Sequence, residues 1–245
     1  MKSLFYFIKK LARIIRNFGR MYERSARFSH GPHQQISTQT RIKTINDSIE
    51  SVLHFWFSEL SNELSPKSQA ELWYAATVQQ DKEIEDKFAY LIERAGSEQL
   101  SDWQNTPKGS LALIILLDQM PRNIHRGSAQ AFAYDALALQ YCLDGIDKGH
   151  DQSLCLIERC FYYHPLEHSE SLTMQNLCLL KFNELEDEYF LDEHIKVIQN
   201  SLQFAKEHAD IIAKFGHFPH RNKVLKRKSS AEEMEYLKTA KRFGQ

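Results

Sequence analysis

Three short polar segments, far apart in the chain, carry the side chains best suited to chemistry. The first runs from Leu117 to Asn123, with Arg126 shortly after it; the second runs from His164 to Glu170, and the third from Phe215 to Asn222. Arginine binds carboxylate or phosphate oxygens through two parallel hydrogen bonds, and asparagine adds neutral donors. The segments therefore predict a site for a small anionic ligand, whose binding residues are Arg122, Asn123, Arg126, His220, Arg221 and Asn222.

A histidine next to a carboxylic acid can accept and return protons, so Glu167 and His168 are the predicted catalytic residues if the protein is an enzyme. The alternative interpretation is structural. Arg122 and Arg221 would pair with Glu167 and Glu170, because helix ends routinely need polar partners. The sequence alone does not decide between the two interpretations.

Helices must position these segments. From Ile45 onward apolar residues recur at intervals of three and four, and no strand-like alternation is sustained. The clearest stripe comprises Ile195, Ile198, Leu202, Ala205, Ala209, Ile212 and Phe215. Residues 111–117 and 132–143 are apolar almost all round, as expected of buried helices. We predict an all-α fold, an antiparallel stack of helices.

Counting helices places the polar segments together. Helices expected at about 127–147 and 151–162 separate the first segment from the second, and those at about 165–186 and 192–215 separate the second from the third. Neighbouring helices with short connections run antiparallel, so an even number of reversals returns the chain to one end of the stack. Asp118 and the other polar residues should meet there. Pro121 is expected to end the helix before it, and Gly216 the helix before it.

No metal and no cofactor are predicted. The sequence from His164 to His168 matches the HxxEH pattern of inverted zinc peptidases. Pro165, however, disfavours a helical conformation at the residue before it, so His164 is expected to lie outside the helix and away from His168. Neither a glycine-rich dinucleotide loop nor a P-loop occurs. The basic run at 221–228 lacks a known nucleic-acid motif, so no nucleic-acid partner is predicted.

The first 28 residues differ in charge from the rest. They hold eight basic residues and one acidic residue, a net charge of +7, whereas the remainder carries −8. Their apolar residues have helical spacing, which predicts a basic amphipathic helix able to bind an anionic membrane surface, with about 1 kcal/mol from each basic residue near it. A helix docked on the body is the alternative. Residues 29–44 read as a polar linker, and residues 45–245 as the helical domain.

The predicted location is the cytoplasm, with membrane association through residues 1–28. No apolar run reaches 18 residues, and no secretory signal pattern is present. The four cysteines lack the spacing of a zinc site and read as reduced, buried thiols. They are Cys142, Cys155, Cys160 and Cys178.

The sequence resembles bacterial domain-of-unknown-function family 924. The resemblance is carried by Phe-Trp-Phe at 55–57, LIILLDQMPRN at 113–123, PLEHSE at 165–170 and FGHFPHRN at 215–222. It covers roughly residues 48–240. Members are similar to tetratricopeptide-like helical proteins, so the resemblance implies that fold, and it implies no activity.

Two functions fit these observations. One is the binding of a small phosphate- or carboxylate-bearing ligand, with acid–base catalysis if the protein is an enzyme. The other is a non-catalytic helical scaffold for a protein partner, tethered to a membrane by residues 1–28. Excess positive charge among the polar segments would favour the first, and fully paired arginines with an exposed apolar groove would favour the second.

Overall fold

The computed structural model describes residues 49–240. The predicted amphipathic helix at 1–28 and the linker at 29–44 lie outside the described residues. From 49 to 240 the chain contains helices, turns and one isolated bridge between Ser61 and Leu64, and no β-strand. The prediction of an all-α fold is confirmed.

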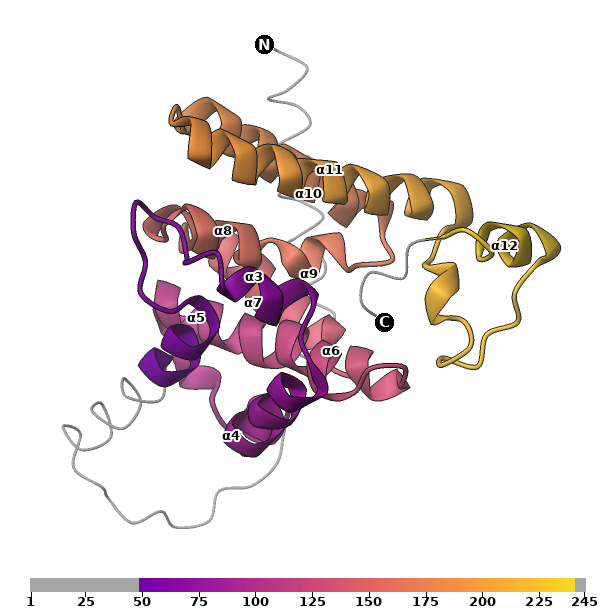
Figure 1. The fold of residues 1–245 in the computed structure, drawn as a ribbon, viewed down its shortest axis with the longest axis horizontal. Helices are drawn as coiled ribbons and strands as arrows, with labels where there is room; N and C mark the ends of the chain where they lie inside the picture. The colour runs from indigo at the N-terminus through magenta and orange to yellow at the C-terminus, as the bar shows by residue number, and fades with distance from the viewer. Residues whose placement is uncertain (1–48, 241–245) are drawn as a thin grey trace. The chain divides into compact units, whose positions relative to one another are not determined.

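A helix that includes residues 49–57 comes first, and short connections join most of the helices that follow. These are α3 (Gln69–Tyr74), α4 (Val78–Gly96), α5 (Pro107–Ile114), α6 (Met120–Ile124), α7 (Asp135–Asp147), α8 (Leu156–Tyr162), α9 (His164–Glu167), α10 (Leu172–Glu188), α11 (Asp192–Phe215) and α12 (Ala231–Tyr236). The long helices α10 and α11 lie side by side over the others (Figure 1).

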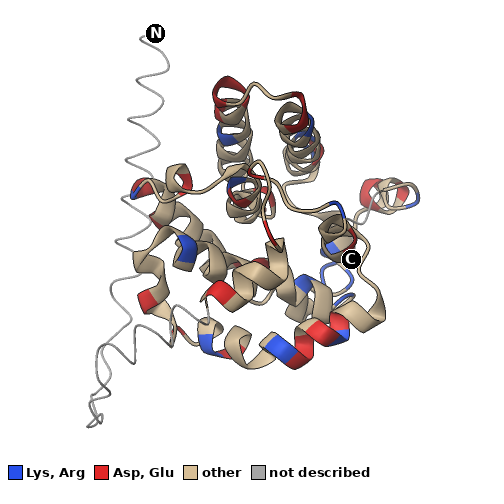
Figure 2. Cartoon of the chain, turned by 60° about the vertical axis from the view of Figure 1, so that its left-hand side comes forward, with Lys and Arg blue, Asp and Glu red and all other residues tan. Residues whose placement is uncertain are grey.

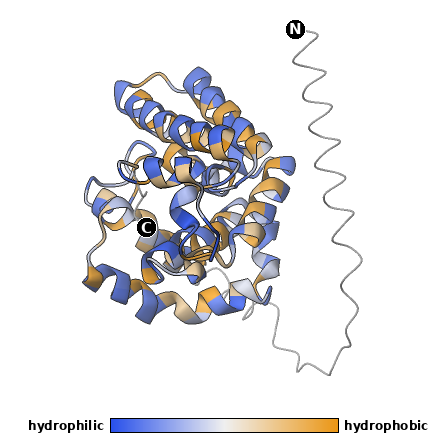
Figure 3. Ribbon diagram, turned by 90° about the vertical axis from the view of Figure 1, so that its right-hand side faces the viewer, coloured by the Kyte–Doolittle hydropathy of each residue, from blue (hydrophilic) through white to orange (hydrophobic). Residues whose placement is uncertain are grey.

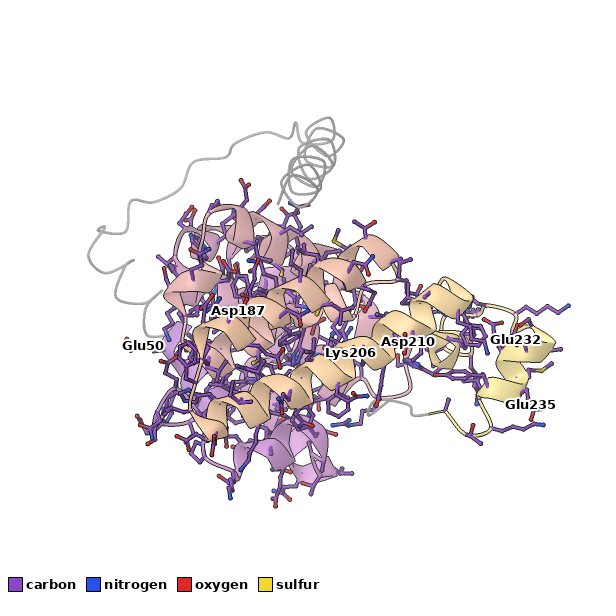
Figure 4. All side chains as sticks on the ribbon, turned by 90° about the horizontal axis from the view of Figure 1, so that it is seen from above. Glu50, Asp187, Lys206, Asp210, Glu232 and Glu235 are labelled. Carbon is purple, nitrogen blue, oxygen red and sulfur yellow. The ribbon has the colours of Figure 1, made fainter. Side chains whose placement is uncertain are left out.

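Helix α11 shows why the stack forms. Its apolar stripe, which includes Ile198, Leu202 and Ile212, is buried, whereas Lys206 and Asp210 lie on its outer side (Figure 4). Apolar and polar residues alternate along the ribbons of the outer helices (Figure 3). Gly216 ends α11 in the left-handed conformation, with φ of 72°, as predicted.

The stretch from α5 to α6 forms the centre of the body. Every residue from Leu111 to Leu117 is fully buried, as predicted. The prediction that Pro121 ends this helix is wrong. A π-helical segment, Ile115–Gln119, joins α5 to α6, and the Met120 N–H donates to the Ile115 carbonyl five residues back. Because the wider π-turn changes the hydrogen-bond spacing just before Pro121, the helix continues despite the missing proline N–H.

The helix expected at about 165–186 is two helices. Helix α9 begins at His164, turns through Pro165 and ends at Glu167, and α10 begins after Ser171. The prediction that His164 lies outside a helix is also wrong. Its carbonyl accepts the N–H of His168, and the two rings lie 5.6 Å apart. Proline is well suited to a first helical turn, where it needs no intrahelical donor, and this outweighs its effect on the preceding residue.

The last described helix, α12, begins at a cap formed by its own neighbouring residues. The Ser230 hydroxyl and the Glu233 carboxylate form a reciprocal capping box at the start of α12.

The four cysteines are free thiols, and all but Cys155 are buried. Acidic and basic residues are interspersed over the helices (Figure 2). None of the described helices is long and apolar enough to cross a bilayer.

Candidate functional site

The three polar segments meet. His168 Nδ1 lies 2.8 and 2.9 Å from the two carboxylate oxygens of Asp118, which joins the second segment to the first. The Phe218 N–H donates to Glu170 at 2.9 Å, which joins the third segment to the second. We call the group formed around these contacts the polar cluster. It consists of Asp118, Arg122, Asp135, Glu167, His168, His208 and Arg221.

Asp118 lies at the centre of the polar cluster and is fully buried. It belongs to the π-helical segment, and such segments often occur at functional sites because they change the direction of side chains and free carbonyl groups. The side chain of Arg122 donates from Nη1 to the Asp118 carbonyl at 2.6 Å. The π-helical segment therefore carries Asp118, and Arg122 in the next turn forms an ion pair with it.

Arg122 is well compensated. Its Nη1 lies 3.2 Å from Asp118 Oδ1, and its Nη2 donates to Asp135 Oδ2 at 3.0 Å. Burial opposes the charge, but the carboxylates of Asp118 and Asp135 outweigh burial and raise the pKa of Arg122. Arg122 is thus a fixed cation of the cluster.

Arg221 is poorly compensated by comparison. It is 6% exposed, and within residues 49–240 its guanidinium makes one hydrogen bond, at 3.3 Å, to the Asp135 Oδ2 that Arg122 also uses. Its guanidinium carbon lies 4.5 Å from the Phe132 ring and 4.4 Å from the Phe218 ring. Burial, and then the charge of Arg122, lower the pKa of Arg221 to about 10.

His168 has the geometry of an oriented base. Since a carboxylate accepts hydrogen bonds, the Nδ1 facing Asp118 carries the hydrogen and Nε2 keeps its lone pair. Within the described chain Nε2 makes no hydrogen bond, and the side chain is 16% exposed. Burial, followed by the charges of Arg122 and His208, lowers the pKa of His168 well below its usual value. The ring is neutral at pH 7.

The pKa of Glu167 is shifted in the opposite direction from that of His168. Its Oε1 lies 3.3 Å from His208 Nδ1, which also contacts the Phe204 carbonyl at 2.8 Å. Burial, and then the charge of Asp118, raise the pKa of Glu167 to about 8, while burial lowers the pKa of His208 to about 4. Glu167 therefore keeps its proton at neutral pH and lies next to a neutral base, His168, in the chain.

Of the other predicted binding residues, Asn123, Arg126 and Asn222 bind side chains that do not belong to the polar cluster. Asn123 donates to Asp81 at 3.0 Å, and Arg126 binds the same carboxylate at 2.8 and 3.1 Å, at the start of α4. Asn222 donates to Ser229 and to Glu233 near α12. The His220 ring lies 5.5 Å from the Phe218 ring, and burial followed by the charge of Arg221 lowers the pKa of His220 to about 3. His220 thus adjoins the cluster.

Two members of the cluster were missed in the sequence. Asp135 lies at the start of α7 and binds both Arg122 and Arg221. It interrupts the apolar run at 132–143, which was the available signal. His208 lies on the buried stripe of α11, between Ala205 and Ala209. A titratable residue within an apolar stripe is a signal of a buried polar contact.

Two further observations bear on function. Within residues 49–240 no three His, Cys, Asp or Glu residues are arranged to hold a metal ion, although His164 and His168 lie side by side. A cavity of about 950 Å³ lies elsewhere on the body and is lined by residues 49–60 in part, with Thr106, Lys108 and Glu158. That cavity does not include the polar cluster.

Comparison with known proteins finds a matching family and a similar solved structure. A family model described as "Bacterial protein of unknown function (DUF924)" matches residues 52–241. A solved protein of unknown function, ATU0120 from Agrobacterium tumefaciens, is similar, with a TM-score of 0.67 and 30% identity over 80% of this chain and 99% of that one. No curated protein matches.

Proposed function

The chain belongs to the bacterial family DUF924, and from this premise we propose that it binds a small anionic ligand, bearing a phosphate or carboxylate, at the polar cluster. We further propose that His168 and Glu167 can move protons on that ligand. The observation that carries the proposal is the state of Arg221, which is buried with most of its N–H donors unused among the described residues.

An under-compensated arginine favours an anion for a simple reason. A buried guanidinium without sufficient hydrogen bonds costs free energy, and an anionic oxygen pair would supply both the charge and the acceptors. Arg221 Nε is buried and has no hydrogen-bond partner in the described chain. Asp135 is shared with Arg122, so it balances only part of the charge.

The acid–base part of the proposal rests on pKa values displaced in opposite directions. Two neighbouring groups, one kept protonated and one kept neutral and basic, can serve as acid and base at the same pH. Glu167 has its pKa raised to about 8, and His168 has its pKa lowered. Asp118 orients His168, so Nε2 would accept a proton while Glu167 donates one.

A calorimetric and thermal-shift titration of the full chain tests the proposal. The probes are inorganic phosphate, phenyl phosphate, acetate and benzoate, each compared with chloride at equal ionic strength. A probe present at about 100 times its Kd should stabilise the folded protein by about 2.7 kcal/mol. We expect at least one probe to bind, and Arg221→Gln to remove that binding.

Arg94→Gln is the matched control, because Arg94 is exposed and makes no ion pair within the described residues. It should bind the probes as the wild type does. Equal binding by the wild type and Arg221→Gln, or no binding of any probe, would reject the proposal.

The second candidate is a scaffold that binds a protein partner and is held at a membrane by residues 1–28. The cavity near residues 49–60 favours it, because Ile49, Leu53 and Phe57 contribute apolar surface there. The cytoplasmic location and the tetratricopeptide-like repeat also stay predictions. Sedimentation of the full chain with anionic vesicles, compared with a chain lacking residues 1–28, tests the membrane contact; equal sedimentation would contradict it.

A further inference from the structure

Positive charge is concentrated in residues 221–228, which lie between α11 and α12 (Figure 1). We call this stretch the basic turn. It holds two arginines, three lysines and no acidic residue, a net charge of +5. Residues 49–240 as a whole hold 19 basic and 30 acidic residues, a net charge of −11. The body as a whole therefore repels a multiply charged anion, whereas the basic turn attracts one.

Backbone hydrogen bonds fix the shape of the basic turn. The Arg227 N–H donates to the Asn222 carbonyl at 2.8 Å, and the Lys226 N–H donates to the Lys223 carbonyl at 3.3 Å. This pair of bonds is a Schellman motif, in which the left-handed residue is usually glycine. Here that residue is Lys226, with φ of 55°. The turn therefore carries a lysine at a position whose backbone conformation favours glycine.

The basic turn borders the polar cluster. Arg227 donates to the two carboxylate oxygens of Glu170 at 2.6 and 2.9 Å, and to the Phe218 carbonyl at 3.1 Å. The Phe218 ring in turn lies 4.4 Å from the guanidinium carbon of Arg221. The side chains of Arg227 and Glu170 are 30% and 27% exposed. This contact therefore lies where the polar cluster approaches the molecular surface.

The charges of the basic turn divide into an inner and an outer set. Arg221 is the inner one, since it is almost fully buried, and its Nε has no hydrogen-bond partner in the described chain. The outer set is Lys223, Lys226 and Lys228, which are exposed and make no ion pair within residues 49–240. Arg227 belongs to neither set, because Glu170 balances its charge. An anionic group at Arg221 would thus have three uncompensated ammonium groups on the same turn.

We infer that the ligand held by Arg221 is a small polyanion, such as a diphosphate, a triphosphate or a polycarboxylate, whose outer anionic groups bind the lysines of the basic turn. The inference rests on the proposed function, because Arg221 holds the inner group. A lysine ammonium on its flexible stem adjusts to the spacing of the outer groups, so the turn selects charge and not one ligand length. An ammonium and an anionic oxygen about 4 Å apart in water attract each other by about fivefold in affinity.

Calorimetric titration of the full chain with two pairs of probes tests the inference. Tripolyphosphate is compared with inorganic phosphate, and citrate with acetate, in metal-free buffer of low ionic strength. The multiply charged member of at least one pair should bind about tenfold more tightly than the other member. The pair that shows the preference tells whether the anionic groups are phosphates or carboxylates. Arg221→Gln should remove the binding of both members.

A basic-turn variant removes the outer set alone. It combines Lys223→Gln, Lys226→Gln and Lys228→Gln, and it is expected to fold because all three side chains are exposed. The preference for the multiply charged probe should fall from about tenfold to about twofold, because the outer groups lose their partners. The singly phosphorylated probe, inorganic phosphate, should still bind through Arg221.

The matched control removes three exposed lysines from other segments, through Lys67→Gln, Lys148→Gln and Lys196→Gln. Lys148 follows the end of α7 opposite to Asp135, and Lys196 lies in the first turns of α11, far along that helix from Phe215. The control has the same net charge as the basic-turn variant. It should keep the full preference, so a difference between the two variants reports the position of the lysines and not their number.

The outcomes separate the inference from the proposed function. If the two members of each pair bind equally through Arg221, the inference is overturned and the proposed function stands. A preference that is the same in the basic-turn variant and in the control also overturns the inference. If Arg221→Gln leaves polyanion binding unchanged, attraction to exposed basic residues explains it and both are rejected. Absence of binding by every probe likewise rejects both.

Discussion

The body contains two groups of charged residues built around buried side chains, and the surroundings shift the pKa values of the two groups in opposite ways. The second group, which we call the Asp151–Lys181 network, lies at α8 and α10 and also includes Arg159, Tyr163, Glu184 and Glu188. Lys181 binds Asp151 at 3.1 Å and Glu184 at 3.0 Å, and Arg159 binds both carboxylate oxygens of Glu188. Each cation has a carboxylate that the other cation does not use.

The pKa shifts report the difference. In the Asp151–Lys181 network burial opposes the charge of Lys181, yet its carboxylate partners raise the pKa of Lys181, and Arg159 lowers the pKa of Glu188. Both shifts favour the charged forms. In the polar cluster the pKa of Glu167 is raised and the pKa values of His168 and Arg221 are lowered, which favours the neutral forms.

Buried charge alone does not identify a functional site. A network whose members stabilise one another's charges is explained by the fold it supports. A cluster whose pKa shifts favour the neutral forms of its groups is not explained in this way. It is the better candidate for ligand binding or proton transfer. Three measurements test this distinction.

Lys181→Met should have the largest effect. The substitution keeps the length of the side chain but leaves the fully buried Asp151 carboxylate without its cation. The free energy of unfolding, measured by urea denaturation at pH 7, should fall by about 3–5 kcal/mol. Lys206→Met, on the exposed side of α11, should change it by less than about 0.5 kcal/mol. A loss below about 1 kcal/mol for Lys181→Met would remove the distinction.

Glu167→Gln should change the pH dependence of stability. Unfolded Glu167 loses its proton near pH 4.5, whereas the folded protein keeps it up to about pH 8. The folded state binds more protons in this interval, so the contribution of Glu167 to stability falls as pH rises. Glutamine does not titrate, and the variant should gain about 2 kcal/mol or more over the wild type between pH 5 and pH 8.

Glu170→Gln is the control for this measurement. Burial opposes its charge, but Arg227 and the Phe218 N–H outweigh burial and lower the pKa of Glu170. Its stabilising contribution should therefore be present above pH 4.5 and disappear as pH falls below that value. A constant difference between Glu167→Gln and the wild type from pH 5 to pH 8 would show that Glu167 is ionised in the folded protein.

Arg221→Met should have the smallest effect on stability. The variant loses one shared hydrogen bond and two ring contacts, but it also removes a charge that burial disfavours. The unfolding free energy should change by about 1 kcal/mol or less in either direction. Arg122→Met, which leaves two carboxylates without their main cation, should cost about 3 kcal/mol. Equal losses would mean that both arginines serve the fold alone.

Much of the fold could be predicted because its signals are local. The stripe of α11, the glycine after it and the capping box at Ser230 each act within a few residues, and each is present in the structure. The meeting of the polar segments was also predicted, because it depends only on the number of reversals between them. Two predicted helix boundaries, at Pro121 and between α9 and α10, are wrong. The number of chain reversals between the polar segments nevertheless stays even, so the segments still meet.

The amino-acid sequence by itself determined that this chain forms a helical stack in which the three polar segments meet, because helical periodicity and the number of chain reversals can be counted along the chain. Only the tertiary structure decided that Arg122 and Arg221 share Asp135, and that His168 lies against Asp118. The tertiary structure also decided which titratable groups have pKa values shifted toward the neutral form. Those properties depend on burial and on distances between segments that the order of residues does not state.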